Sequence, residues 1–285
     1  MHPVLFEIPT PWGPVPIYSY GVMLGCSLLA AWGLVMRLGA RAENLDPERM
    51  ANAFLATAVA AIVGARGLYV LTNPEEFTHP GQWLALRSGG LVAYGGFLGG
   101  FVGSWIYLRR QKISLLAWAD VVAPSLGLGL GLTRIGCYLF GCDFGRPLGE
   151  GAPAWLKAAG TFPRRADGGS PAWAHHVARY DLAPGAEASL PVHPTQLYES
   201  LVGFLLFGLA LVLWRRRRFR GQIILALTLA YGVWRFFIEY LRDDPERGFY
   251  FGFSTSQLIS LALVPIAGFL YHELRKRGRV AAAPA

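Results

Sequence analysis

Residues 197–214 read LYESLVGFLLFGLALVLW, and four arginines, Arg215 to Arg218, follow them directly. The apolar run has nearly the length of a helix that crosses the hydrocarbon core of a bilayer, which needs roughly 20 mainly apolar residues. The arginines would meet the anionic headgroups of a cytoplasmic leaflet. This stretch therefore predicts a transmembrane helix whose carboxyl end faces the cytoplasm.

Similar apolar stretches recur along the chain, at residues 17–36, 51–72, 91–108, 119–140, 222–240 and 255–271. Hydrophobic residues make up 53% of the 285 residues and charged residues only 15%. A soluble domain carries about a quarter charged residues. We therefore expect an all-α integral membrane protein with about seven transmembrane helices, forming a single membrane domain over residues 1–285.

Lysine and arginine are concentrated in alternate loops, which predicts the orientation. The richer side holds, besides Arg215 to Arg218, the residues Arg37, Arg41, Arg49, Arg109, Arg110, Lys112, Arg220, Arg275, Lys276, Arg277 and Arg279. The poorer side holds Arg87, Arg146, Lys157, Arg164, Arg165, Arg179, Arg242 and Arg247. The amino terminus is then outside and the carboxyl terminus cytoplasmic. The net charge of +8 reflects this topology, so we expect no nucleic-acid partner.

Two outer segments interrupt the helical pattern. The first 16 residues contain Pro3, Pro9, Pro11, Pro14 and Pro16, which predict an irregular lead-in. Residues 142–192 are rich in Gly, Pro, Ala and charged residues and form one large outer loop or small head insertion. A connection of this length is usually functional, as a lid or a partner-docking arm, or else disordered.

Two of the apolar stretches carry glycine at helical spacing. The glycines are Gly95, Gly96, Gly99, Gly100 and Gly103 in one stretch and Gly127, Gly129, Gly131 and Gly136 in the other. Small residues four apart let helix backbones approach closely in lipid. They indicate either tight helix packing or thin walls around a lipid-sized cleft.

Polar residues within the apolar stretches gather near the outer ends. The predicted topology places these residues there: Tyr20, Arg66, Tyr94, Arg134, His193, Gln196, Tyr198, Glu199, Tyr231, Arg235, Glu239 and Arg242. Ionisable groups inside a membrane are costly, so they usually mark a functional site or a partner. Their convergence on one level of the outer leaflet predicts a site there.

Tyr231, Arg235, Glu239 and Arg242 share one face of their helix. Arg235 and Glu239 either neutralise each other or belong to a binding site. Arg242 and Arg134 would remain cationic, apart from the nearby Asp143, Asp243 and Asp244. A surplus of arginines at headgroup depth would bind a lipid phosphate, because the guanidinium fork matches phosphate oxygens.

The histidine and the cysteines leave several interpretations open. His193 either helps to begin its helix or belongs to the site, where neighbouring arginines would lower its pKa. Cys26, Cys137 and Cys142 are too few for a disulfide framework. Cys137 and Cys142 either form a disulfide, stay as buried thiols, or serve catalysis or a metal. Because no metal-ligand pattern stands out, we expect no metal and no cofactor.

Several motifs run in a fixed order between positions 20 and 242. They are Tyr20-Gly21, Gly64-Ala65-Arg66, Gly95-Gly96 after Tyr94, Asp120 with Ala123-Pro124, Arg134-Ile135-Gly136, Gly145-Arg146, His193-Pro194-Thr195-Gln196-Leu197-Tyr198-Glu199, Tyr231-Gly232, Arg235-Phe236, Glu239 and Arg242. Jointly, this set resembles the bacterial prolipoprotein diacylglyceryl transferase family.

The resemblance implies a membrane enzyme that acts on lipid. It would transfer the diacylglyceryl group of phosphatidylglycerol to the lipobox cysteine of prolipoprotein signal peptides, forming a thioether and releasing glycerol phosphate. The site would face the outer leaflet of the bacterial inner membrane. The implied catalytic residues are Arg134, Arg235, Tyr94 and His193. The implied substrate-binding residues are Tyr20, Arg66, Gln196, Tyr231, Glu239 and Arg242.

The chain departs from the family pattern at two positions. Tyr94 stands where many members have histidine, and Cys137 where many have asparagine. The acceptor thiol would be activated by Tyr94, by His193 or by the arginine charges alone, and we favour the last. The alternatives are a catalytically silent relative that binds lipid or prolipoprotein, and an anion transporter. The apolar inner halves of the helices disfavour the transporter.

Overall fold

A computed structural model describes residues 3–11, 13–42, 45–77, 79–84, 90, 92–165, 169–243 and 248–277. Arg87, Arg247, Arg279 and Asp244, which entered the predictions of orientation and charge, lie outside these ranges. The chain divides into two compact units, Met1–Ala31 with Val122–Ala285, and Trp32–Val121. The division cuts through two long helices, α1 (Ser19–Ala42) and α4 (Leu115–Phe140). The predicted single membrane domain remains a prediction.

The described residues are mainly helical and include six helices long and apolar enough to cross a membrane. These are α1, α2 (Pro47–Thr72), α4, α7 (Thr195–Arg215), α8 (Gln222–Ile238) together with the 3₁₀ turn that continues it to Leu241, and α9 (Thr255–Arg277). The predicted span 91–108 corresponds to α3 (Ala93–Arg110), an 18-residue helix that ends in two arginines and is not among the six. The chain is therefore a mainly helical, multi-pass membrane protein.

In the Trp32–Val121 unit, α2 and α3 pack closely through glycine. A methyl group at Gly95 would lie 2.3 Å from the Gly64 carbonyl oxygen, and one at Gly99 would lie 2.3 Å from that of Ala60. Both positions must therefore lack a side chain. These contacts confirm the packing interpretation of this glycine-rich stretch. Two short 3₁₀ turns, η1 (Pro74–Glu76) and η2 (Pro80–Leu84), follow α2.

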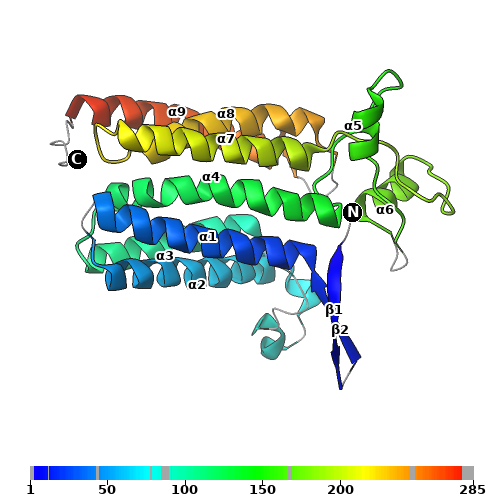
Figure 1. Ribbon diagram of the computed structural model, residues 1–285, viewed down its shortest axis with the longest axis horizontal. Coiled ribbons are helices and arrows are strands. Elements are labelled where there is room, and N and C mark those ends of the chain that lie inside the picture. The colour runs from blue at the N-terminus through cyan, green and yellow to red at the C-terminus, as the bar shows by residue number, and fades with distance from the viewer. Residues whose placement is uncertain are drawn as a thin grey trace. The chain divides into compact units, whose positions relative to one another are not determined.

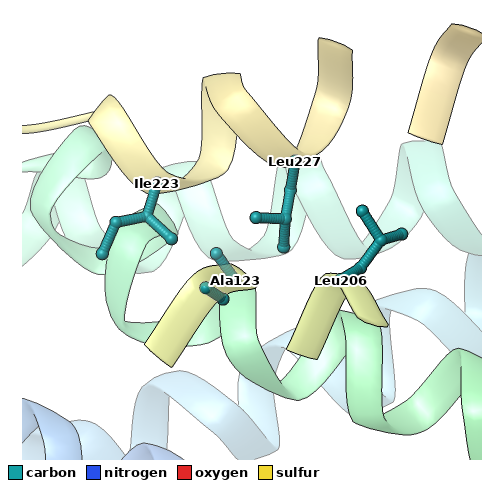
Figure 2. Close-up of a cluster of buried hydrophobic side chains, with 5 residues drawn as sticks. Ala123, Leu206, Ile223 and Leu227 are labelled. Carbon is teal, nitrogen blue, oxygen red and sulfur yellow. The ribbon is translucent and has the colours of Figure 1, made fainter. Parts of the chain in front are cut away.

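In the other unit, α7, α8 and α9 run side by side (Figure 1). A cluster of small and branched side chains joins α4, α7 and α8, with Ala123, Leu206, Ile223 and Leu227 at its centre (Figure 2). A methyl group at Gly203 would lie 2.4 Å from the backbone nitrogen of Gly131. This close approach of α7 to α4 brings their polar ends together.

The amino-terminal segment is more regular than its prolines predict. Strands β1 (Val4–Thr10) and β2 (Gly13–Tyr18) form an antiparallel hairpin, so the expected irregular lead-in is wrong. Pro9 lies opposite Pro14 next to the turn, and a two-stranded hairpin consists of edge strands, where a missing N–H is tolerated.

Residues 142–192, within their described parts, form a small packed head near the ends of α4 and α7 (Figure 1). It contains α5 (Ala154–Ala159) and α6 (Pro171–Arg179) and buries Phe144, Phe162, Ala172 and Val192. After α8 come η4 (Glu239–Leu241) and a short hairpin of β3 (Phe249–Tyr250) and β4 (Phe253–Ser254). Gly145 forms an antiparallel bridge with Arg242, so the head is joined to the chain that follows α8.

Candidate functional site

Three arginines converge on Glu199, a fully buried carboxylate in the second turn of α7. Arg134 Nε of α4 lies 2.8 Å from Glu199 Oε2, and Arg242 Nη1 lies 3.6 Å from the same oxygen. Arg235 Nη1 of α8 lies 3.7 Å from Glu199 Oε1. A buried carboxylate needs such compensation, so Glu199 holds the ends of three segments at fixed distances from one another.

Asp143 joins the arginines from the head side. Its carboxylate pairs with Arg134 Nη1 at 2.6 Å and with Arg242 Nη2. The residue has a positive φ of 58°, and Thr195 Oγ1 donates to its carbonyl oxygen at 2.7 Å. Burial alone would raise the pKa of Asp143, but Arg134 and Arg242 outweigh burial and hold that pKa well below its ordinary value. Asp143 is therefore ionised at neutral pH.

Arg235 is held by two further partners. Glu239 Oε2 lies 2.9 Å away, one helical turn along the chain, and Arg235 Nη2 donates to Ser256 Oγ of α9 at 2.9 Å. Arg134, Arg235 and Arg242 thus face Asp143, Glu199 and Glu239, so the charges of these six residues balance. The predicted surplus of cations is wrong, because Asp143 and Glu199 both pair with Arg134 and Arg242.

The exposure of these side chains shows where the cluster opens. Glu199 is 0% exposed, Arg242 4% and Arg134 16%, whereas the Asp143 side chain is 29% exposed. Asp143 is therefore the most exposed carboxylate of the cluster. The cluster is closed on the Glu199 side and accessible on the Asp143 side.

Other predicted residues lie near this cluster. Gln196 Nε2 donates to the Cys142 carbonyl at 2.6 Å, while Gln196 Oε1 is buried and has no hydrogen-bond partner in the described residues. Tyr231 packs against the core shared by α4, α7 and α8. Tyr20 lies against Gly136, whose added methyl group would meet the Tyr20 Cα at 3.2 Å.

His193 lies beside the cluster, at the junction of the head and α7. Its Nδ1 is 3.4 Å from Tyr198 Oη, and its backbone pairs with Gly145 and Arg146. Burial lowers the pKa of His193, so the imidazole is neutral at pH 7. The predicted direction is confirmed, but the cause is burial, not neighbouring arginines.

Arg66 and Tyr94 belong to the Trp32–Val121 unit. Arg66 donates to the carbonyl oxygens of Gln82, Trp83 and Gly90 at 2.8–3.0 Å, so it organises the connection between α2 and α3. Tyr94 lies in the first turn of α3 and is 43% exposed. Roles for both residues at the Glu199 cluster stay predictions.

Sequence reasoning placed Glu199 among the polar residues at the outer ends and named Asp143 as a nearby counter-charge, but it assigned neither residue a role in the site. Glu199 had a signal, since a carboxylate inside the apolar run 197–214 is costly without a partner. Asp143 carried little signal, because an aspartate in a polar loop is ordinary. Only the packing of α4 against α7 shows that the two carboxylates share arginines.

Cys137 and Cys142 are free thiols at the edge of this cluster. Their sulfur atoms and an Asp143 carboxylate oxygen lie within 4.8 Å of one another, and Arg134 Nη1 is 3.8 Å from Cys137 Sγ. A metal ion here would have to compete with the guanidinium group for Asp143. The donor set therefore favours an arginine pair over a metal.

The helices and the buried cluster define a multi-pass membrane protein with a buried arginine–carboxylate cluster. The chain belongs to the prolipoprotein diacylglyceryl transferase family, because a family model described as "Prolipoprotein diacylglyceryl transferase" matches residues 3–272. Members of this family are transferases.

Individual relatives agree with the family model. A phosphatidylglycerol–prolipoprotein diacylglyceryl transferase of Clostridium tetani is 29% identical over 272 residues, covering 95% of this chain and 97% of the relative. A relative from Clostridium perfringens, named phosphatidylglycerol–prolipoprotein diacylglyceryl transferase 2, is 33% identical over 267 residues, covering 92% of this chain and 93% of the relative. A phosphatidylglycerol–prolipoprotein diacylglyceryl transferase of Symbiobacterium thermophilum is 33% identical over 277 residues, covering 94% of this chain and 92% of the relative.

Proposed function

We propose that this chain transfers the diacylglyceryl group of phosphatidylglycerol to the lipobox cysteine of a prolipoprotein signal peptide. A carbon–sulfur bond forms, the bond between the glycerol carbon and the phosphate oxygen breaks, and glycerol phosphate leaves. The thiol proton passes to a base. The observation that carries the proposal is the convergence of three arginines beside an accessible carboxylate, in a chain of this family.

The lipid phosphate would take the place of the Asp143 carboxylate between Arg134 and Arg242. The carboxylate is a planar oxyanion and the phosphate is a tetrahedral one, and both accept hydrogen bonds from guanidinium groups. Glu199 keeps the arginines in place during this exchange, because it is fully buried and touches all three. Negative charge grows on the leaving phosphate in the transition state, and fixed guanidinium groups stabilise that charge.

Further substrate-binding roles are proposed for Gln196, Glu239, Tyr20, Tyr231 and Arg66, the last of which lies in the Trp32–Val121 unit. Gln196 Oε1 is a buried acceptor and suits a hydroxyl of the glycerol headgroup. Glu239 orients Arg235 at 2.9 Å, so that Arg235 faces the leaving group. Tyr20, Tyr231 and Arg66 complete the binding set that we propose.

The acceptor thiol needs a base, because the charges of the cluster balance. A net positive cluster would have lowered the thiol pKa by itself, but the pairing of Asp143 and Glu199 removes that net charge. His193, kept neutral by burial, is the base we propose. Replacing His193 by Gln should then slow transfer more than Tyr94→Phe, and the opposite order would assign the base to Tyr94.

The proposed setting is the bacterial inner membrane, with about seven spans and the site towards the outer leaflet. Neither cofactor nor metal enters the proposed reaction. The partners are phosphatidylglycerol, lipobox signal peptides and the surrounding lipid.

The test is an assay of the purified protein with phosphatidylglycerol and a lipobox peptide, read by the mass of the peptide. A diacylglyceryl mass gain should appear and should be absent from a Cys→Ser peptide. Arg235→Ala should abolish the gain, whereas Arg277→Ala, the same change at an exposed position of α9, should not. Peptide binding without a gain, beside an active family member, would instead support a catalytically silent relative.

A further inference from the structure

Cys137 and Cys142 take no part in the proposed reaction, yet the end of α4 holds them together. The amides of Gly141 and Cys142 both donate to the Cys137 carbonyl, at 2.8 and 3.2 Å, and Gly141 has a φ of 87°. A left-handed helix cap of this kind brings the side chain four positions before the glycine into contact with the one that follows it. In this chain both of those side chains are thiols.

The two thiols are close enough for side-chain rotation to bring them into bonding distance. Their sulfur atoms lie within 4.8 Å of each other, and the pair is free in this structure. A disulfide needs about 2 Å between the sulfur atoms, which requires side-chain rotation while the cap hydrogen bonds hold the backbone. Cys26, in α1, is exposed at the helix surface and serves as an internal reference.

We propose that Cys137 and Cys142 form a redox modification site, whose disulfide strengthens anion binding at Arg134. In the step, a disulfide of a thiol oxidant accepts two electrons and two protons, becoming two thiols, while the Cys137–Cys142 bond forms. The proposal rests on the proposed topology, which puts the pair on the outer, oxidising side of the membrane.

The link to the site runs through Asp143. Cys142 Sγ is 3.8 Å from Asp143 Oδ2, the oxygen that also pairs with Arg134 Nη1 at 2.6 Å. A disulfide removes the S–H donor, so Asp143 loses one of the contacts that hold it beside Arg134 and becomes easier for a phosphate to displace. The contact with Cys137 and burial both raise the pKa of the Cys142 thiol, so in the reduced protein Cys142 carries the S–H group that faces Asp143.

The first arm of the test maps the bond in the full-length protein. The protein is treated with oxidised glutathione, free thiols are alkylated, and the digest is analysed by mass spectrometry. The peptide with Cys137 and Cys142 should carry no alkyl group and be two hydrogens lighter, and dithiothreitol should reverse this. Cys26 should be alkylated throughout. Alkylated Cys137 and Cys142, or glutathione adducts alone, would overturn the proposal.

The second arm measures the affinity for glycerol phosphate, a probe that has no thiol and requires no turnover. The oxidised protein should bind it about fivefold more tightly than the reduced protein. Cys142→Ser should lose this sensitivity to the oxidant, and Cys26→Ser should retain it. Equal affinity in both redox states, or an equal gain in Cys142→Ser, would overturn the effect on the site. The first arm detects the Cys137–Cys142 disulfide by mass spectrometry even if the transferase proposal is wrong.

Discussion

Glu199 is the residue on which the geometry of the site depends most directly, because Arg134, Arg235 and Arg242 all touch it. Glu199→Gln keeps the shape and removes the charge, so the arginines repel one another and shift. A displacement of about 1 Å can cost on the order of 100-fold in rate. We expect a loss of that size in kcat, and KM for phosphatidylglycerol should fall because the cluster becomes cationic.

Glu273 offers a matched control for this prediction. It makes the same kind of ion pair with Lys276 and Arg277, but at the exposed end of α9. Glu273→Gln should leave both kinetic constants unchanged, since exposed pairs contribute at most about 1 kcal/mol. A Glu199→Gln variant with wild-type kcat would contradict the positioning role of Glu199.

Asp143 should behave in the opposite way, because it competes with the substrate. Asp143→Asn removes the negative charge that a phosphate displaces from Arg134 and Arg242. We therefore expect glycerol phosphate to inhibit the variant at concentrations about 10-fold lower, which corresponds to 1.4 kcal/mol of binding free energy. The measurement is product inhibition at fixed pH. Weaker inhibition in the variant would mean that Asp143 supports the phosphate site.

Among the structural elements, the head contains a histidine that should make it sensitive to pH. His176 is fully buried, and its Nδ1 accepts from the Leu190 amide at 3.1 Å. Burial and then the charge of His175 lower its pKa to about 4, although Asp243 opposes them. Unfolded histidine has a pKa of about 6.5, so between these values the unfolded state binds more protons and stability rises with pH.

The consequence is a local loss of stability in acid. From pH 7 to pH 5 the opening free energy around His176 should fall by about 2 kcal/mol. Hydrogen exchange of the Leu190 amide, corrected for its intrinsic pH dependence, should accelerate accordingly. His176→Asn retains an acceptor but does not titrate, so its protection should be nearly constant. An equal acceleration in that variant would show that another group is responsible.

More of the helices than of the site contacts can be predicted from the sequence. Helices such as α7 are predicted because the length of an apolar run is read directly from the chain, and Arg134, Arg235 and Glu239 are predicted because charges inside such runs are rare. The pairing of Glu199 with the arginines was missed, and Asp143 was only one of three aspartates named as counter-charges, because these contacts depend on how α4 and α7 rotate against each other. The β1–β2 hairpin was missed because prolines are compatible with edge strands.

At the scale of the whole molecule, the orientation depends on whether α3 crosses the bilayer. Its 18 residues span about 27 Å at 1.5 Å per residue, close to the hydrocarbon thickness of about 30 Å. If α3 crosses, the chain has seven spans, the head is outside and the carboxyl end is cytoplasmic. If it does not, every element after α3 lies on the opposite side.

Single cysteines in a cysteine-free background separate these two topologies. We expect a membrane-impermeant maleimide to label Thr10→Cys in the β1–β2 hairpin and Glu150→Cys in the head of intact cells. Gln111→Cys after α3 and Lys276→Cys at the end of α9 should react only after the membrane is opened. Since the crossing of α3 decides all positions after it, the six-span topology predicts the reverse for Glu150, Gln111 and Lys276, with Thr10 unchanged. Labelling of Gln111→Cys in intact cells would therefore also place the Glu199 cluster towards the cytoplasm, where the lipobox cysteine of an exported precursor would not reach it.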